Sequence, residues 1–359
     1  MCDMDSKADH NNRIAWIDNA KGIGILCVLF GHLALNEGNK LHLFTWIYSF
    51  HMPLFFFLSG LTYRYKPAKE AIRSRMKSLG IPYFIFSTLT ILKHTVLSLR
   101  DASFDVRQSM KEMLGIIIAL RDSPYYTTLW FVTCLISIIV IMQLIELVGS
   151  RKGYLGGVSV LVVFILGIVY NHYVNRFLPW SIDVALISVN FFYIGFILSK
   201  FINNQNKYSL IIIGVSFIAS ALFCYINYLV TGISVDMYSG RYGNYFFFWI
   251  SAMAGILVIV EVSKVLDDSI KPLAFIGKNS LFYYGAHLLV LEWVRAPIQL
   301  VCDTKSEFVK TAIYIVAALL FTAVLSLFVP IYKKITGLFA NQLDRLVLRK
   351  MSRQNGERL

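Results

Sequence analysis

The amino-acid sequence predicts an all-α polytopic membrane protein with about ten transmembrane helices and with both termini on the inner side. Hydrophobic residues make up 57% of the 359 residues and charged residues only 15%, whereas a soluble domain carries about 25% charged residues. The apolar residues also fall into runs of about 20, the length that crosses a bilayer as a helix. A chain with so few charges in this arrangement indicates a protein whose solvent is lipid.

Apolar runs follow one another along the whole chain. They occupy residues 15–35, 44–63, 80–99, 128–148, 154–174, 181–201, 208–230, 245–265, 274–296 and 309–333. A shorter amphipathic helix over 108–121 is predicted to lie in the membrane interface, with Met110, Met113, Leu114, Ile117 and Ile118 on one side. The segments between runs are too short for a soluble domain, and the sequence shows no internal repeat.

Lysine and arginine residues predict the orientation of these helices. With the N-terminus inside, the inner segments hold 21 of them and the outer loops hold 8, as the positive-inside rule requires. We therefore predict a cytoplasmic tail over 1–13, a membrane domain over 14–335 and a basic cytoplasmic tail over 336–359, helical at first. The net charge of +13 then faces anionic lipids of the cell membrane, and no nucleic-acid partner is expected.

The cysteines and the first residues exclude other classes. Cys2, Cys27, Cys134, Cys224 and Cys302 contain no CxxC pair and no spacing typical of metal ligands, so we expect neither a disulfide framework nor a metal site. Residues 1–13 are polar and the first apolar run is long. That run is therefore predicted to be a retained span and not a cleaved signal peptide.

Three polar residues mark the first predicted span. Lys21 and His32 are eleven residues apart, which places them about 20° from a common helix face and about 16 Å apart along the axis. Asp18 precedes Lys21 by three residues and can pair with it. A charged residue in a spanning helix is costly and is a functional candidate by default. The alternative is that Lys21 snorkels to the interface and that His32 merely meets water there.

A second histidine is expected to face the first. His51 precedes Pro53 by two residues, which suits the first turn of the second span. A short connection makes the first two spans antiparallel neighbours, so His32 and His51 are predicted to share one outward-facing pocket. Histidine titrates near neutral pH and is the usual general base for a hydroxyl nucleophile.

A basic segment and a third histidine complete the candidates. Residues 63–77 contain Arg73, Arg75 and Lys77 on the predicted inner side, either as a positive-inside anchor or as a site for the phosphates of coenzyme A. In the ninth span, Asn279 or Ser280 is predicted to cap the helix. His287 lies two turns deeper and is either a buried structural histidine or part of a site. No role is assigned to His10, His42, His94, His172, Lys93, Glu146, Asp183 or Glu261.

Several of these segments resemble a known family in its order. They are Asp18-x-x-Lys21-Gly22, Gly31-His32, Ser49-Phe50-His51-Met52-Pro53-Leu54-Phe55-Phe56 with Ser59-Gly60, Leu129-Trp130-Phe131, and Gly277-Lys278-Asn279-Ser280-Leu281 with His287. Together they resemble the acyltransferase family 3 membrane proteins, and most closely the branch of fucose 4-O-acetylase-like proteins.

The resemblance implies an acyl-CoA donor on the inside and a sugar acceptor on the outside. It implies that His32, which matches the family's basic-x10-His motif with Lys21, is the catalytic base, and that Lys21 binds or orients the donor. Many members also carry Arg-x-x-Arg ahead of a proline. Here Arg73-Ser74-Arg75-Met76-Lys77 precedes Pro82, so the spacing departs from the family pattern.

The hypothesis is therefore a membrane O-acyltransferase that moves an acyl group, expected to be acetyl from acetyl-CoA, to a hydroxyl of a cell-surface carbohydrate or lipid-linked glycan. His51 is expected to orient the acceptor or to stabilise the oxyanion, and transfer is either direct or through an acyl-histidine relay. Asp18, Arg73, Arg75, Lys77, Asn279 and His287 are candidate binding residues. The main alternative is a transporter or flippase of a lipid-linked glycan. A membrane acyltransferase built around a His–Asn pair is a further alternative.

Overall fold

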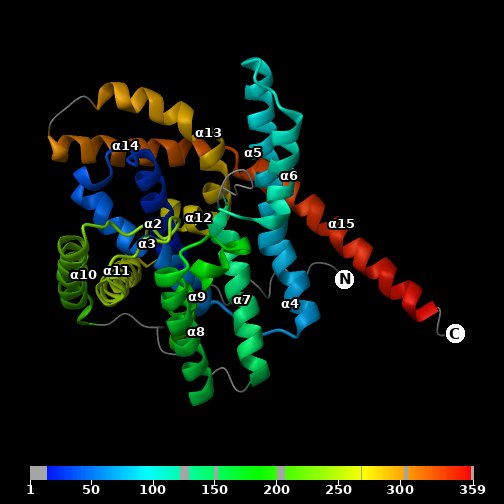
Figure 1. Cartoon of the computed structure of the whole chain (residues 1–359), viewed down its shortest axis with the longest axis horizontal. Helices are drawn as coiled ribbons and strands as arrows, with labels where there is room; N and C mark the ends of the chain where they lie inside the picture. The colour runs from blue at the N-terminus through cyan, green and yellow to red at the C-terminus, as the bar shows by residue number, and fades with distance from the viewer. Residues whose placement is uncertain are drawn as a thin grey trace.

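The computed structural model describes residues 14–121, 129–148, 153–199, 207–267, 269–302 and 306–356 (Figure 1). The protein is all-α, as predicted. The predicted N-terminal tail over 1–13 lies outside the described residues. So do Arg151, Lys152, Lys200 and Lys305, which entered the orientation count.

The long helices match the predicted runs in order. Their bounds are α2 Ala15–Leu33, α3 His42–Leu61, α4 Ala68–Arg75, α5 Ile81–Arg100, α6 Val106–Ile118, α7 Trp130–Val148, α8 Tyr154–Tyr173, α9 Ile182–Leu198, α10 Ser209–Thr231, α11 Tyr245–Leu266, α12 Lys271–Lys278, α13 Ser280–Val301, α14 Glu307–Ser326 and α15 Val329–Gly356. A π-helical turn, Met76–Gly80, joins α4 to α5.

Seven helices among the described residues are long and apolar enough to cross a membrane. They are α3, α7, α8, α9 with the turn before it, α10, α11 and α14, so the protein is a polytopic membrane protein. The other three predicted spans form α2, α5 and α13, which carry more polar side chains. That these three helices cross the bilayer stays a prediction, and so does the orientation of the termini.

Three local predictions were wrong. The predicted span 274–296 is two helices, with Asn279 between α12 and α13; its side chain does not accept from the next helix but donates to the Phe275 carbonyl at 2.7 Å. The predicted span 309–333 ends at Ser326, and α15 begins at Val329 just before Pro330. His51 is not in a first turn, because α3 begins at His42 and Pro53 lies inside the helix.

Two smaller elements form as predicted. The amphipathic segment is α6, and its Met110, Met113, Leu114 and Ile117 side chains are exposed. The start of the basic tail is helical, since α15 runs through the predicted boundary between residues 335 and 336. The interfacial position of α6 and that domain boundary stay predictions.

Close helix crossings hold α2 and α3 at the centre of the bundle. Glycines occupy the point where α2 meets α12, namely Gly22 and Gly277, and a Cβ on Gly277 would overlap the Asp18 carbonyl. Gly60 and Gly195 likewise occupy the point where α3 meets α9, and a Cβ on either would overlap the backbone of the other helix. Small residues at such crossings let backbones approach closely, which is the main way helices pack in a membrane. These contacts fix the two helices that carry His32 and His51.

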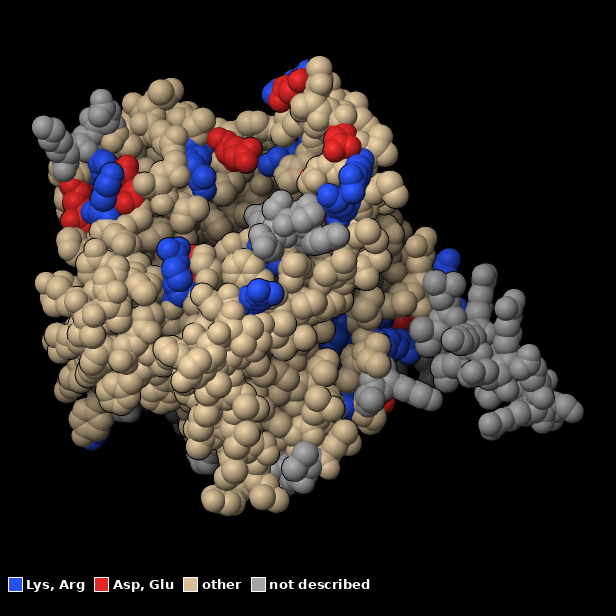
Figure 2. Space-filling model, in the orientation of Figure 1, with Lys and Arg blue, Asp and Glu red and all other residues tan. Residues whose placement is uncertain are grey.

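The periphery has a different character from the centre. Only 17% of the α8 segment, 22% of α10 and 28% of α14 are buried, although these helices are strongly apolar, so their exposed faces suit lipid. In Figure 1 the α5–α6 pair and α15 extend away from the main body. Figure 2 shows acidic side chains mainly around a hollow at the top of that view, with basic side chains among them.

Candidate active site

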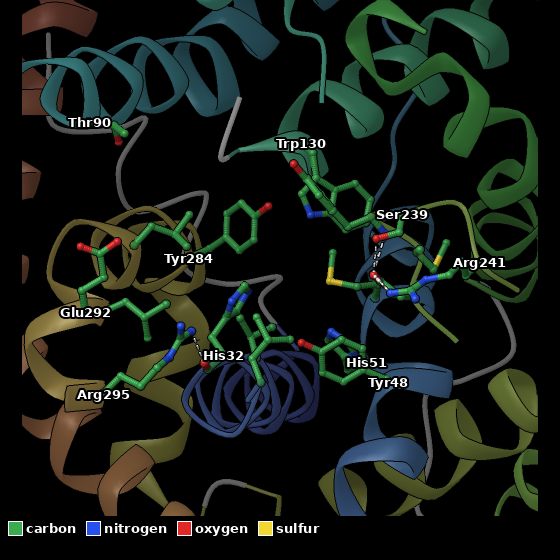
Figure 3. A pocket seen from close by; sticks show the side chains of 18 of the residues that line it. His32, Tyr48, His51, Thr90, Trp130, Ser239, Arg241, Tyr284, Glu292 and Arg295 are labelled. Atoms are coloured by element: carbon green, nitrogen blue, oxygen red, sulfur yellow. Dashed lines mark hydrogen bonds and ion pairs between the residues drawn. The ribbon is translucent and has the colours of Figure 1, made fainter. Parts of the chain in front are cut away.

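A cavity of about 590 Å³ lies between α2, α3, α5, α7, α13 and the loop that follows α10 (Figure 3). His32 and His51 both line it, as the sequence predicted. Tyr48, Trp130 and Tyr284 add aromatic walls, and the charged Lys93, Asp236, Arg241, Glu292 and Arg295 lie around it. A concave space that brings aromatic and apolar side chains together with convergent polar groups is a common form of a small-molecule site.

His32 and His287 lie against one another. Their ring centroids are 4.8 Å apart, with 50° between the ring planes. The side chain of His287 is fully buried on α13, and its Nδ1 donates to the Tyr283 carbonyl at 2.9 Å. Because the proton is on Nδ1, the Nε2 atom of His287 presents a lone pair, and this buried atom has no hydrogen-bond partner. A histidine that lines the cavity is thus backed by a neutral one.

His51 is held in one tautomer by its own helix. Its Nδ1 donates to the Ile47 carbonyl at 2.9 Å, and its ring centroid lies 4.9 Å from that of Tyr48. The Nε2 atom then carries a lone pair and can only accept a hydrogen bond while the ring is neutral. A neutral His51 can therefore take a hydrogen bond from a hydroxyl group but cannot donate one to an oxyanion through Nε2.

Arg295 is a cavity residue that the sequence reasoning missed. Its Nη2 donates to the His32 carbonyl at 2.6 Å (Figure 3), and its Nε atom is buried without a partner. The contact satisfies a carbonyl at the C-terminal end of α2, where a cation is favourable. The signal in the sequence was its position two turns beyond His287 on the same helix.

The loop after α10 forms the opposite side of the cavity. The Asp236 carboxylate accepts from the Tyr238 amide at 3.1 Å, from the Ser239 hydroxyl and from Arg241 at 3.1 Å. The Tyr238 ring lies 6.2 Å from that of Trp130. No local pattern in the sequence marked this loop, because its residues reach the cavity only through the packing of α10 and α11.

Asp18, Lys21 and Asn279 do not reach this cavity. Asp18 and Asn279 are buried near the crossing of α2 and α12, and Lys21 is half-buried on α2. The separation of eleven positions between Lys21 and His32 accounts for this, since it corresponds to about 16 Å of helix. The structure therefore separates these three candidates from the histidines.

The basic candidates lie at yet another place and contact other parts of the protein. Arg73 donates to Asp344 of α15 at 2.6 Å and 3.1 Å, and Lys77 donates to the same carboxylate at 2.6 Å. These hydrogen bonds hold the pKa of Asp344 below its ordinary value. The Arg75 guanidinium lies 5.6 Å from the centre of the Tyr63 ring. We call Arg73, Arg75 and Lys77 the basic cluster.

Metal ligands do not gather in the parts of the chain that the structure describes: no three His, Cys, Asp or Glu side chains are placed to hold an ion. Comparison with protein families gives one finding. The acyltransferase domain of the acyltransferase 3 family matches residues 14–329, which include the cavity and the basic cluster and end at the first residue of α15. No curated protein and no solved structure shows a significant match to the chain.

Proposed function

Because this chain belongs to the acyltransferase 3 family, which implies acyltransferase activity, we propose that it moves an acetyl group from acetyl-CoA to a hydroxyl of a cell-surface carbohydrate or lipid-linked glycan. The observation that carries the proposal is the pairing of His32 with His287 at a cavity that His51 also lines. The similarity to fucose 4-O-acetylase-like proteins supports the sugar acceptor, and the cell membrane is the proposed location.

In the proposed reaction, His32 removes the proton from the acceptor hydroxyl as its oxygen attacks the thioester carbonyl. The tetrahedral intermediate then collapses, the carbon–sulfur bond breaks, and the thiolate of coenzyme A takes the proton back from His32. General base catalysis supplies about 10²–10⁴-fold, and positioning with oxyanion stabilisation supplies the remainder. In a relay, the imidazole nitrogen of His32 attacks the thioester first and the carbon–sulfur bond breaks to release coenzyme A. The acceptor hydroxyl oxygen then displaces the imidazole from the acetyl group, and its proton passes to the released imidazole.

Two neighbours receive roles from their hydrogen-bonding capacity. His51 accepts a hydrogen bond from the acceptor sugar, because its Nδ1 proton is committed to the Ile47 carbonyl. Arg295 stabilises the oxyanion, because its side chain lines the cavity and a guanidinium group is a strong hydrogen-bond donor to oxyanions. These roles sharpen the choice left open for His51 by sequence.

The donor's phosphates are proposed to bind the basic cluster. The support is that Arg73 and Lys77 already hold one anionic group, the Asp344 carboxylate, between them. A phosphate offers similar oxygens with more charge, and arginine and lysine bind it well. Lys21, on α2 about 16 Å before His32 along the helix axis, is proposed to orient the donor.

The test is acetyl-CoA turnover by purified protein with a panel of surface glycans. We expect His32→Ala to lower turnover by about 10²–10⁴-fold, and the exposed His172→Ala to leave it unchanged. Retained turnover in His32→Ala would move the base to His51 or His287. Absence of thioester loss with every glycan would favour the transporter, and a glycan-flux assay would then decide.

A further inference from the structure

We infer that the buried ion pair between Arg121 and Asp183 positions the 233–243 loop as the wall of the cavity that recognises the acceptor sugar. Both residues are then positioning residues that set acceptor specificity. This inference rests on the proposed function for the identity of the substrate. It goes beyond that function because neither residue lines the cavity.

The ion pair joins segments that are far apart in the sequence. The Arg121 side chain is 0% exposed and that of Asp183 is 6% exposed. Nη2 of Arg121 donates to Asp183, and Nη1 donates to the carbonyls of Met237, at 3.2 Å, and of Tyr238. A charge removed from water to this extent is costly unless it is fully paired. Here Nη2 of the arginine is paired with Asp183 and Nη1 with the loop backbone, while its buried Nε atom has no hydrogen-bond partner.

Further contacts join the segments of Arg121 and Asp183 to their surroundings. The Tyr238 hydroxyl donates to the Arg121 carbonyl at 3.0 Å, and the Leu178 amide donates to Asp183 at 3.2 Å. The Arg121 guanidinium also lies 4.6 Å from the centre of the Phe177 ring. The start of α9 is thereby tied to the loop through a single guanidinium group.

Within the 233–243 loop, the chain is held in a tight conformation. Asp236 and Arg241 exchange backbone hydrogen bonds of 2.7 Å and 2.9 Å, and Gly240 and Gly243 have φ angles of +68° and +66° that favour glycine. Three donors from this loop bond the Asp236 carboxylate. Asp236 therefore holds the loop together.

The loop presents groups that suit a sugar ring. Tyr238, Ser239 and Arg241 line the cavity, and the edge of the Tyr238 ring packs against that of Trp130. Figure 3 shows Ser239 and Arg241 beside Trp130. Aromatic rings cover the apolar face of a pyranose, while hydroxyl and guanidinium groups bind its hydroxyls. Ser234 also bonds Asn39, just after α2, so the loop lies at the His42 end of α3. The basic cluster follows the other end of this helix, about 30 Å away.

The experiment compares Asp183→Asn with Glu261→Gln. The control breaks another buried ion pair, Glu261 with Lys264 at 2.7 Å, whose residues do not line the cavity. We expect Asp183→Asn to accelerate amide hydrogen exchange in the 233–243 loop and to raise the acceptor KM at least tenfold. The donor KM and acetyl-CoA hydrolysis without acceptor should stay within twofold of wild type. Glu261→Gln should change none of these quantities.

The inference would be overturned if loop exchange rose no more in Asp183→Asn than in Glu261→Gln, or if donor and acceptor KM rose together. Should Asp183→Asn fail to fold, Tyr238→Phe removes only the hydroxyl bond to Arg121 and should raise loop exchange. Failure of the wild type to acetylate any glycan would count against the proposed function alone, because hydrogen exchange still decides whether the ion pair holds the loop.

Discussion

At the scale of single residues, His287 shows how position changes the meaning of a histidine. In the sequence it is one polar residue in an apolar helix, whereas in the fold its ring faces His32 and its proton is committed to Tyr283. We propose that it positions the His32 ring through this ring contact, because the buried His287 ring is itself held by its own hydrogen bond to the Tyr283 carbonyl.

This proposal gives a measurable prediction. His287→Ala should lower kcat by about 10–100-fold, by analogy with the loss of a partner that orients a metal-bound histidine, with a smaller change in acceptor KM. The measurement is steady-state acetyl transfer, with His172→Ala as the control for purification. An unchanged kcat would assign His287 a purely structural place.

At the scale of elements, the crossing of α2 and α12 decides where the first helix lies. Gly277→Ala should lower the thermal unfolding midpoint, because the added methyl would overlap the Asp18 carbonyl and overpacking costs about 1–3 kcal/mol. Gly214→Ala in α10 is the matched control, since nothing lies within 4 Å of its added Cβ. Equal midpoints for the two variants, measured in detergent, would show that the crossing tolerates a side chain.

The attachment of α15 gives a second prediction at this scale, and it concerns pH. The pKa of Asp344 is lowered by hydrogen bonds from Lys77 and Arg73. The contact therefore stabilises the attachment of α15 fully at any pH above the ordinary pKa of an aspartate. It is lost as pH falls through the lowered value. A spin label attached through Gln342→Cys, at an exposed position of α15, in a Cys2→Ser background, should therefore have the same low mobility from pH 8 to pH 5. It should become mobile only at lower pH.

The control for this prediction is Asp344→Asn, which removes the carboxylate charge. The label should then be mobile at every pH. If Asp344→Asn left the label as immobile as in the wild type at neutral pH, the ion pair would not be what holds α15 near α4. A transition centred near pH 6 or 7 would instead point to a histidine.

At the scale of the whole molecule, a prediction concerns the orientation of the protein in the membrane. The excess of Lys and Arg on one side predicts that both termini are cytoplasmic. A green fluorescent protein fused after Leu359 should fluoresce, and alkaline phosphatase inserted at Gly38 should be active. The controls exchange the two reporters: alkaline phosphatase fused after Leu359 should be inactive, and green fluorescent protein inserted at Gly38 should not fluoresce. The opposite pattern would invert the molecule and place the cavity on the cytoplasmic side.

Much of the fold could be predicted because a helix that crosses lipid requires a continuous run of apolar residues, which is visible in the local sequence. Runs of apolar residues and the breaks between them located α7, α8, α10 and α11 to within a few residues, whereas α4 and α12 were not predicted as separate helices. Local patterns failed where a neighbour decided the outcome, as at Asn279, whose amide bonds back to Phe275. The fold class and the seven apolar spans thus follow from composition and length, which need no knowledge of contacts.

The site was only partly readable for the same reason. Sequence alone determined that His32 and His51 should meet, because a short connection makes neighbours of the helices that carry them. Only the tertiary structure brought Arg295 to His32 across 263 residues, and Arg121 to Asp183 across 62. Which distant helices touch depends on the shapes of side chains at each crossing, and on buried charges that must find partners. Neither leaves a periodic pattern along the chain.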